Sequence, residues 1–178
     1  MNGDKGRIRT RTRLWKIHSK DPLLYIMLRE GKDVERVLRF FKDVKVERRE
    51  IHGNVFLTEG INFIWRMVTG EAGLTPFDEN NSYIGVGNGT DPENASQTGL
   101  TGTQKYYKRV DSGYPKINGN QITFRATFNI DEANFTWNEW TVANGPNDNA
   151  INLNRKVEAL GSKTSGQVWI MEITLSIS

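Results

Sequence analysis

A short segment in the second half of the chain carries residue types that can bind or cleave sugars. Asp131, Glu132 and Glu139 lie close in sequence to Trp137 and Trp140. Paired carboxylates can act as the acid and the base or nucleophile of glycoside cleavage, and indole rings can stack on sugars. Proximity along the chain does not establish the spacing between two carboxylates, however. A simpler interpretation makes Asp131 and Glu132 part of a hairpin turn, with the two tryptophans on different faces of the following strand.

A glycine-rich run offers a second kind of chemistry. Gly85-Val86-Gly87-Asn88-Gly89-Thr90 could let backbone amides approach a phosphate closely. A phosphate loop, however, needs Gly-Lys-Ser/Thr at the start of a helix, whereas this run continues into Asp91-Pro92. The sequence therefore predicts a strand-ending turn in preference to a nucleotide site.

Metal and nucleophile chemistry has less support. His18 and His52 lie far apart and have no carboxylate at ligand spacing, and there is no cysteine. Four acidic residues could offer oxygen ligands to calcium but do not follow the EF-hand pattern, namely Asp78, Glu79, Asp91 and Glu93. No Gly-x-Ser-x-Gly elbow occurs. We therefore expect no metal, no cofactor and no enzymatic activity.

The basic charge of the chain is concentrated at its start. Residues 1–20 contain seven Lys and Arg residues and one Asp, which gives this segment +6; because the 178-residue chain carries +3, the remainder carries −3. The arginines alternate with β-branched residues, a period of two that favours an extended conformation. We expect a basic arm that orders on a neighbouring subunit, with a solvated arm as the simpler alternative. The residues expected to bind the partner are Arg7, Arg9, Arg11, Arg13, Trp15 and Lys16.

Nucleic acid is a second possible partner of this arm. Lysine and arginine neutralise phosphates, and Trp15 and Tyr25 could stack on bases. The rest of the chain is net acidic and has no recognised reading module, so we expect the arm to contact protein in preference to nucleic acid. No apolar run approaches the roughly 20 residues that a membrane-spanning helix needs. A membrane partner is therefore not expected.

Two helices are predicted before residue 71. Asp33 can cap an amphipathic helix that reaches Phe41, and a strand follows from Val44 to Arg49. The apolar run 23–28 is too short to classify. In the second helix, Thr58 is the predicted cap and Gly70 the stop. The apolar face expected to pack deeply consists of Ile61, Ile64, Trp65 and Val68.

Beyond Gly70 the pattern changes to short strands separated by Gly, Asn, Asp and Pro. The strands are predicted at residues 83–86, 105–110, 121–130, 136–143, 153–160 and 167–178. Their connections are too short for parallel pairing, and the last strand needs a partner at each edge. We expect a mainly β fold: an antiparallel β-sandwich or partly open barrel with one or two short α-helices and an extended basic N-terminal arm. The predicted division is an arm with an amphipathic helix over residues 1–53 and a β-rich domain over residues 54–178.

From residue 54 onward the chain resembles a family of small structural proteins of tailed bacteriophages. The likeness rests on an ordered series of segments: Phe56-Leu57-Thr58-Glu59-Gly60-Ile61-Asn62-Phe63-Ile64-Trp65, Ile84-Gly85-Val86-Gly87, Asp111-Ser112-Gly113-Tyr114-Pro115, residues 122–128, residues 132–140 and Asn154-Arg155-Lys156-Val157-Glu158. This resemblance implies a virion protein, assembled in the cytoplasm of the bacterial host, that has no catalytic signature. It does not cover the first fifty residues.

The leading hypothesis combines this resemblance with the basic arm. The protein would decorate a capsid, binding the major capsid protein of the outer shell and other copies of itself as a homo-oligomer. Two alternatives remain: a tail, neck or fibre-associated virion protein, and a glycan-binding module that uses Trp137, Trp140 and Glu139.

Overall fold

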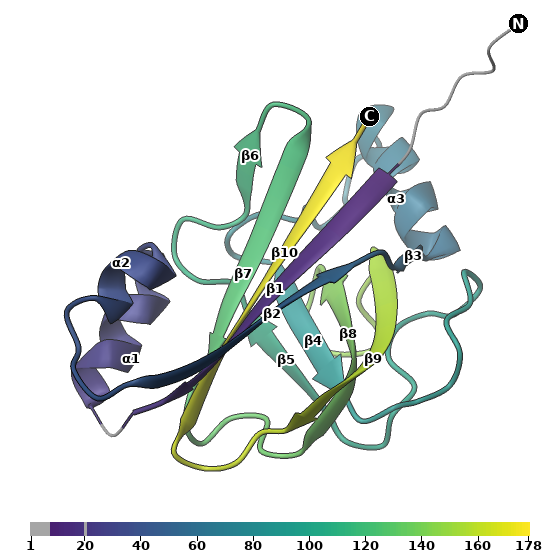
Figure 1. Ribbon diagram of the computed structural model, residues 1–178. Coiled ribbons are helices and arrows are strands. Elements are labelled where there is room, and N and C mark those ends of the chain that lie inside the picture. The colour runs from purple at the N-terminus through teal and green to yellow at the C-terminus, as the bar shows by residue number, and fades with distance from the viewer. Residues whose placement is uncertain (1–7, 20) are drawn as a thin grey trace, which may run out of the picture.

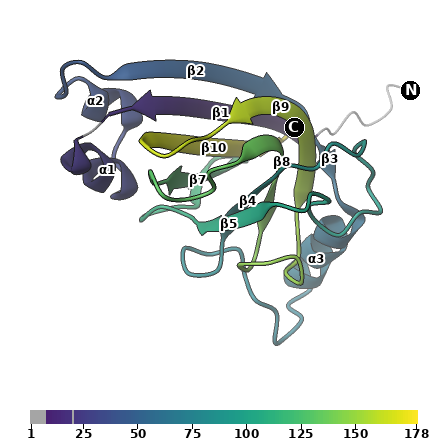
Figure 2. The ribbon, with the colours of Figure 1, turned by 90° about the horizontal axis from the view of Figure 1, so that it is seen from below.

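Two antiparallel β-sheets of five strands each lie face to face in the computed structural model, which describes residues 8–19 and 21–178 (Figures 1 and 2). The first sheet has the order β2 (Lys45–His52), β1 (Ile8–His18), β10 (Gln167–Ile177), β7 (Gln121–Phe128) and β6 (Lys116–Asn118). The second has the order β3 (Val55–Phe56), β9 (Asn154–Ser162), β8 (Thr136–Ala143), β4 (Tyr83–Gly87) and β5 (Lys105–Arg109). The predicted mainly β, antiparallel sandwich is confirmed.

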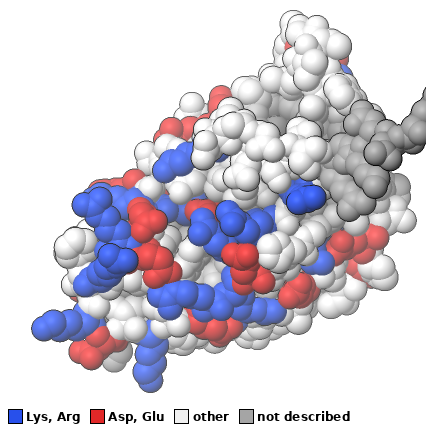
Figure 3. All heavy atoms as spheres, turned by 45° about the horizontal axis from the view of Figure 1, so that its top comes forward, with Lys and Arg blue, Asp and Glu red and all other residues white. Residues whose placement is uncertain are grey.

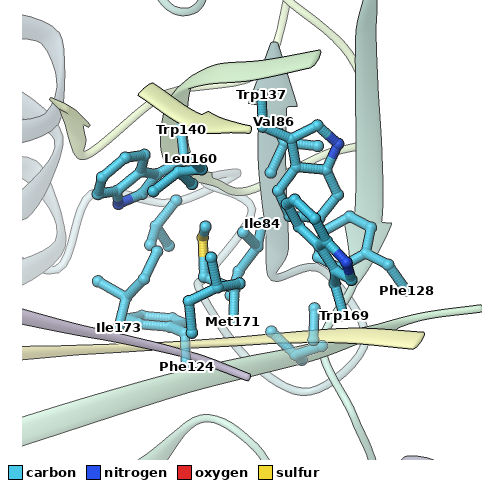
Figure 4. Packing of buried hydrophobic residues seen from close by; sticks show 14 of the residues in the cluster. Ile84, Val86, Phe124, Phe128, Trp137, Trp140, Leu160, Trp169, Met171 and Ile173 are labelled. Atoms are coloured by element: carbon cyan, nitrogen blue, oxygen red, sulfur yellow. The ribbon is translucent and has the colours of Figure 1, made fainter. Parts of the chain in front are cut away.

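Aromatic rings fill the interior between the two sheets. The Trp137 ring lies edge-on to the rings of Phe128 and Trp169, with centroids 4.7 Å apart in both pairs. Ile84 and Met171 pack nearby from opposite sheets (Figure 4). These side chains are fully or almost fully buried, so removal of their surface from water is the main force that holds the sheets together.

The described part of the predicted arm is a strand inside the first sheet, and this corrects the expectation of an extended arm. β1 pairs with β10 along its whole length, from Ile8 opposite Ile177 to His18 opposite Gln167, and its other edge pairs with β2 (Figure 1). The physical reason is that β10 is a long, largely buried strand whose free edge would otherwise leave backbone groups unpaired. Strands from both sides of residue 53 thus share one sheet, and Arg7 lies outside the described residues.

Three helices occur in the described chain, against the one or two expected. α1 (Pro22–Arg29) and α2 (Val34–Leu38) cover one end of the outer face of the first sheet. Each begins at an aspartate cap: Asp21 accepts a hydrogen bond from the Leu23 amide, and Asp33 accepts one from the Arg36 amide. Trp15, Ile17 and Val168 of the sheet join the helices in a second, smaller core. No helix of the described residues is long and apolar enough to span a membrane.

α3 (Thr58–Val68) lies where predicted but turns a different face inward. Its buried residues are Gly60 and Phe63, whereas Trp65 and Val68 of the predicted packing face are exposed. The reason is steric: a Cβ at Gly60 would lie 2.6 Å from the Leu153 Cα, so only glycine allows this side of the helix to approach the strand connection so closely. The expectation that α3 is deeply packed is therefore wrong.

The predicted hairpin between β7 and β8 is also wrong, because these strands lie in different sheets. The connection crosses the open side of the sandwich and is held by hydrogen bonds. Lys163 Nζ donates to the Asn129 carbonyl oxygen and to Asn134 Oδ1, and Trp137 Nε1 donates to the Ala133 carbonyl oxygen. Crossing allows both apolar strand faces to line the same interior from opposite sides.

The interior position of β1 is open to a direct test. Leu14→Ala should lower the free energy of unfolding by about 2–5 kcal/mol, because Leu14 is fully buried between the sheets. Arg9→Ala, on the exposed face of the same strand, should change it by no more than about 0.5 kcal/mol. Urea denaturation of both variants measures the difference. Equally small effects of the two substitutions would show that β1 is not an interior strand of the sheet.

Candidate functional site

Both tryptophans of the candidate sugar site lie in the core. A β-bulge between Trp137 and Glu139 shifts the register of β8 against β9. The extra residue resets the alternation of side chains, so Trp137 and Trp140 both point inward although their numbers differ by three (Figure 4). The two rings have no exposed surface. The prediction that they occupy different faces of the strand is wrong.

Glu139 points to the opposite, outer face of β8, where it forms a buried ion pair. Its Oε2 lies 2.7 Å from Arg155 Nη2 of β9, and neither side chain is exposed. Three backbone amides also donate to this carboxylate, those of Gly89, Thr101 and Gly102. The segment between β4 and β5 therefore folds back over the second sheet and is pinned to it.

The glycine-rich run supplies the close approach that this carboxylate requires. A Cβ at Gly87 would lie 2.5 Å from Glu139 Oε1, and one at Gly89 would lie 2.4 Å from the same atom. The run was predicted to be a strand-ending turn without a bound phosphate, and β4 does end at Gly87. The Gly89 amide nevertheless approaches an anion, which is the side chain of Glu139. This use of the run explains its glycines without a bound phosphate.

The remaining acids of the sugar-site hypothesis do not converge with Glu139. Asp131 is exposed, and Glu132 forms an ion pair with Lys108 at 2.5 Å while accepting a hydrogen bond from the Asn129 amide. Because Glu139 and the two tryptophans are buried on opposite faces of one strand, they form no groove for a sugar. These residues therefore cannot form the glycan-binding site that was hypothesised.

A second buried ion pair fastens the helices to the first sheet. Asp111 Oδ2 lies 2.8 Å from Arg125 Nε, and both side chains are about 1% exposed. Arg125 also donates to the carbonyl oxygens of Leu28 and Lys32, next to α1 and α2. Arg125 lies within the predicted strand 121–130, on the face opposite Phe124. No local pattern shows that an outward-facing arginine will be covered by a distant helix.

The acidic residues considered for calcium are also engaged within the protein. Asp78 Oδ1 accepts hydrogen bonds from the Asn80 and Asn81 amides, and Glu93 Oε1 accepts one from the Val157 amide. No group of three or more His, Asp or Glu side chains in the described residues has a geometry suited to a metal ion.

The predicted partner-binding residues divide into two groups. Arg9 and Arg11 are exposed and form no ion pair among the described residues. The others are tied into the fold: Arg13 pairs with Glu172, Trp15 Nε1 donates to Glu35 Oε1, and Lys16 pairs with Glu47 while its ammonium lies over the Trp169 ring. Of the predicted partner-binding residues that the structure describes, only Arg9 and Arg11 are exposed and without an ion pair.

An uncharged surface that the sequence analysis missed lies beside the start of β1. A groove of about 620 Å³ runs between α3 and the ends of the first sheet, and all of its lining residues are uncharged. Ile8, at the start of β1, lines it together with Met67 and Ile122. The exposed stripe of α3 consists of Ile61, Trp65 and Val68. We call the groove and this stripe together the apolar surface. Its most exposed residues are Trp65 (62%), Ile177 (65%), Val68 (70%) and Ile117 (78%).

The stripe of α3 could have been recognised in the sequence only as an apolar face. Ile61, Trp65 and Val68 follow the spacing i, i+4 and i+7, which is typical of a buried helix face. A second apolar row at Gly60, Phe63, Ile64 and Met67 occupies the adjacent side and faces the sandwich and the groove. A helix with two apolar rows can bury only one of them against its own domain.

Comparison with known proteins identifies no relative. No protein-family model matches the chain, and neither the curated proteins nor the solved structures include a match.

Loss of the Glu139 charge should destabilise the fold strongly. Glu139→Gln leaves the buried Arg155 guanidinium without its counter-charge, so we expect unfolding free energy to fall by about 3–5 kcal/mol. The control is Glu158→Gln, which breaks the partly exposed pair with Arg49 and should cost no more than about 1 kcal/mol. Chemical denaturation measures both, and equal losses would show that the buried network is not the stronger restraint.

The contact between α2 and the first sheet should weaken in acid. Arg48 donates to both carboxylate oxygens of Glu35, and this contact, assisted by Trp15, lowers the pKa of Glu35 from 4.5 to about 2. A lowered pKa in the folded state adds stability above about pH 4.5, and this stability is lost as the pH falls toward 2. Because the pair is half exposed, its contribution is below about 1 kcal/mol.

The measurement compares melting temperatures of the wild type and Glu35→Gln. The variant should melt a few degrees lower at pH 7, since about 1 kcal/mol corresponds to roughly 2–4 °C in a domain of this size. The difference should disappear between pH 4.5 and pH 2. A difference that stays constant over this interval would contradict the role of the Glu35 charge.

Proposed function

We propose that this protein is a structural component of a bacteriophage particle, and within that class a capsid-associated decoration protein that binds the outer shell and its own copies. The single observation that carries the proposal is the apolar surface. Arg9 and Arg11 add exposed positive charge on the face of β1 opposite to Ile8, which lines the groove. A contiguous exposed surface of this kind is typical of a protein docking site.

The side chains that could have formed a catalytic or sugar-binding site are buried and stabilise the fold, which supports an assembly role. Glu139 and Asp111 serve buried ion pairs, and the core tryptophans hold the sheets together. What the molecule offers to the outside is an uncharged surface with an exposed tryptophan, a residue type that often dominates binding energy at protein interfaces.

The choice of a phage particle rests on the resemblance of the segments beyond residue 54. These segments make up much of α3 and of β3, β4, β7, β8 and β9, which are five of the ten strands of the sandwich. A rigid sandwich suits a subunit that must withstand assembly. The choice of an acidic shell as the partner rests on Arg9 and Arg11, because paired opposite charges guide association and fix its register.

A shell-addition experiment tests this proposal. The double variant Arg9→Glu with Arg11→Glu should bind preformed shells at least about tenfold more weakly, and added salt should weaken wild-type binding because it screens exposed charges. The matched control is Arg39→Glu with Lys42→Glu, two exposed basic residues at and beyond the end of α2, which should bind like the wild type.

Copy number in purified particles separates the two virion roles. Quantitative mass spectrometry should find hundreds of copies per particle if the protein decorates the shell. A few to tens of copies would assign it to the tail, neck or fibre, and failure of the wild type to bind shells would remove the decoration role.

A further inference from the structure

The apolar surface contains both a projection and a hollow. Trp65 and Val68 project from the outer stripe of α3, and the groove of about 620 Å³ lies directly beside them, since Val68 and Met67 also line it. Ile117 and Ile177 form the far side of the groove on the first sheet. A knob and a hole on the same surface allow two identical surfaces to fit each other.

The composition of the groove restricts what can fill it. Its lining is uncharged and mostly apolar, with Asn120 and Gln121 as the polar members, so a suitable occupant must bring apolar side chains and no unpaired charge. The first seven residues of the chain, Met-Asn-Gly-Asp-Lys-Gly-Arg, contain three charged side chains and one large apolar one. That composition does not match the groove.

We infer that the occupant is a second copy of this chain. In a two-fold pair the stripe of α3 from each copy covers the groove of the other, so that two antiparallel α3 helices lie between the two sandwiches. Trp65 of one copy then enters the groove between Ile117 and α3 of its partner. Antiparallel packing also sets the positive end of each helix dipole near the negative end of the other.

The extent of the surface is appropriate for such a pair. Four large apolar residues of the surface are more than 60% exposed, and together with Ile8, Ile61 and Met67 they present on the order of several hundred Å² of apolar area. A stable interface of standard size uses about 800 Å² per partner. One copy of the apolar surface with its polar margin therefore provides about the area that a dimer needs.

The distribution of charge favours the same contact. Lys and Arg side chains are interspersed with Asp and Glu over much of the face in Figure 3, with uncharged surface beside them. The chain carries a net charge of only +3, so the overall repulsion between two copies is weak. The groove lining contains no charged side chain, so the copies can approach there without desolvating one.

This inference deepens the proposed function and rests on it in taking the occupant to be a protein subunit. The dimer is measured on isolated protein, whereas decoration is measured with shells, so each can fail without the other. A dimer without shell binding leaves the inference standing, and shell binding by a monomer overturns the inference alone.

Light scattering coupled to size exclusion tests the dimer. Wild type should run at twice the chain mass of 20.3 kDa, and Trp65→Ser should raise the dimer dissociation constant at least roughly tenfold, as expected for a central tryptophan. Phe40→Ser is the matched control, because Phe40 is 70% exposed but lies outside the groove. Far-ultraviolet circular dichroism spectra that match the wild-type spectrum show that both variants are folded; the melting temperature is not used for this, because a weaker dimer lowers it by mass action.

Site-specific cross-linking tests the arrangement. The chain has no cysteine, so Val68→Cys on one tagged copy and Ile117→Cys on another can be joined by a short bis-maleimide only across an interface. We expect a mixed cross-linked dimer, and none when Phe40→Cys replaces Val68→Cys. A wild type that stays monomeric at high concentration, a dimer insensitive to Trp65→Ser, or a monomer whose Trp65 emission responds to a fatty-acid probe overturns the inference.

Discussion

The pairing of β10 with β1 on one edge and β7 on the other is the constraint on which the rest of the molecule depends. β10 contributes Trp169, Met171 and Ile173 to the interior, and each of its edges needs hydrogen-bond partners. β1 supplies one of them, so strands from near the two ends of the sequence lie side by side in one sheet (Figure 1). The register of β1 leaves Arg9 and Arg11 exposed and places Ile8 at the groove. The exposed arginines and the apolar surface thus lie near the same end of β1 but on opposite faces of the strand.

Two buried ion pairs hold the connecting segments against the outer faces of the two sheets. Glu139 with Arg155 secures the long connection between β4 and β5 over the second sheet, and Asp111 with Arg125 secures α1 and α2 over the first. Inside a protein an unpaired charge is costly, whereas a paired one with further hydrogen bonds is tolerated and fixes the geometry around it. Glu139, which first suggested catalysis, is therefore engaged in holding the fold together.

The strands followed from the sequence because their signal is local. Alternating side chains at 121–130 and 167–178 located β7 and β10, and the cap at Asp33 located α2. Which strands share a sheet depends on contacts distant in sequence, so the interior position of β1 and the crossing between β7 and β8 could not be predicted. The apolar surface was missed because the spacing of Ile61, Trp65 and Val68 is the same for a buried face as for a docking face. Similarly, the bulge before Glu139 has no signature that separates it from regular alternation.

A reconstruction of intact particles at side-chain resolution tests the central claim most directly. The account predicts the sandwich on the outside of the shell, with the apolar surface covered by a second copy and Arg9 and Arg11 against acidic side chains. Particles that lack this chain, or a bound chain whose apolar surface faces solvent, would contradict it.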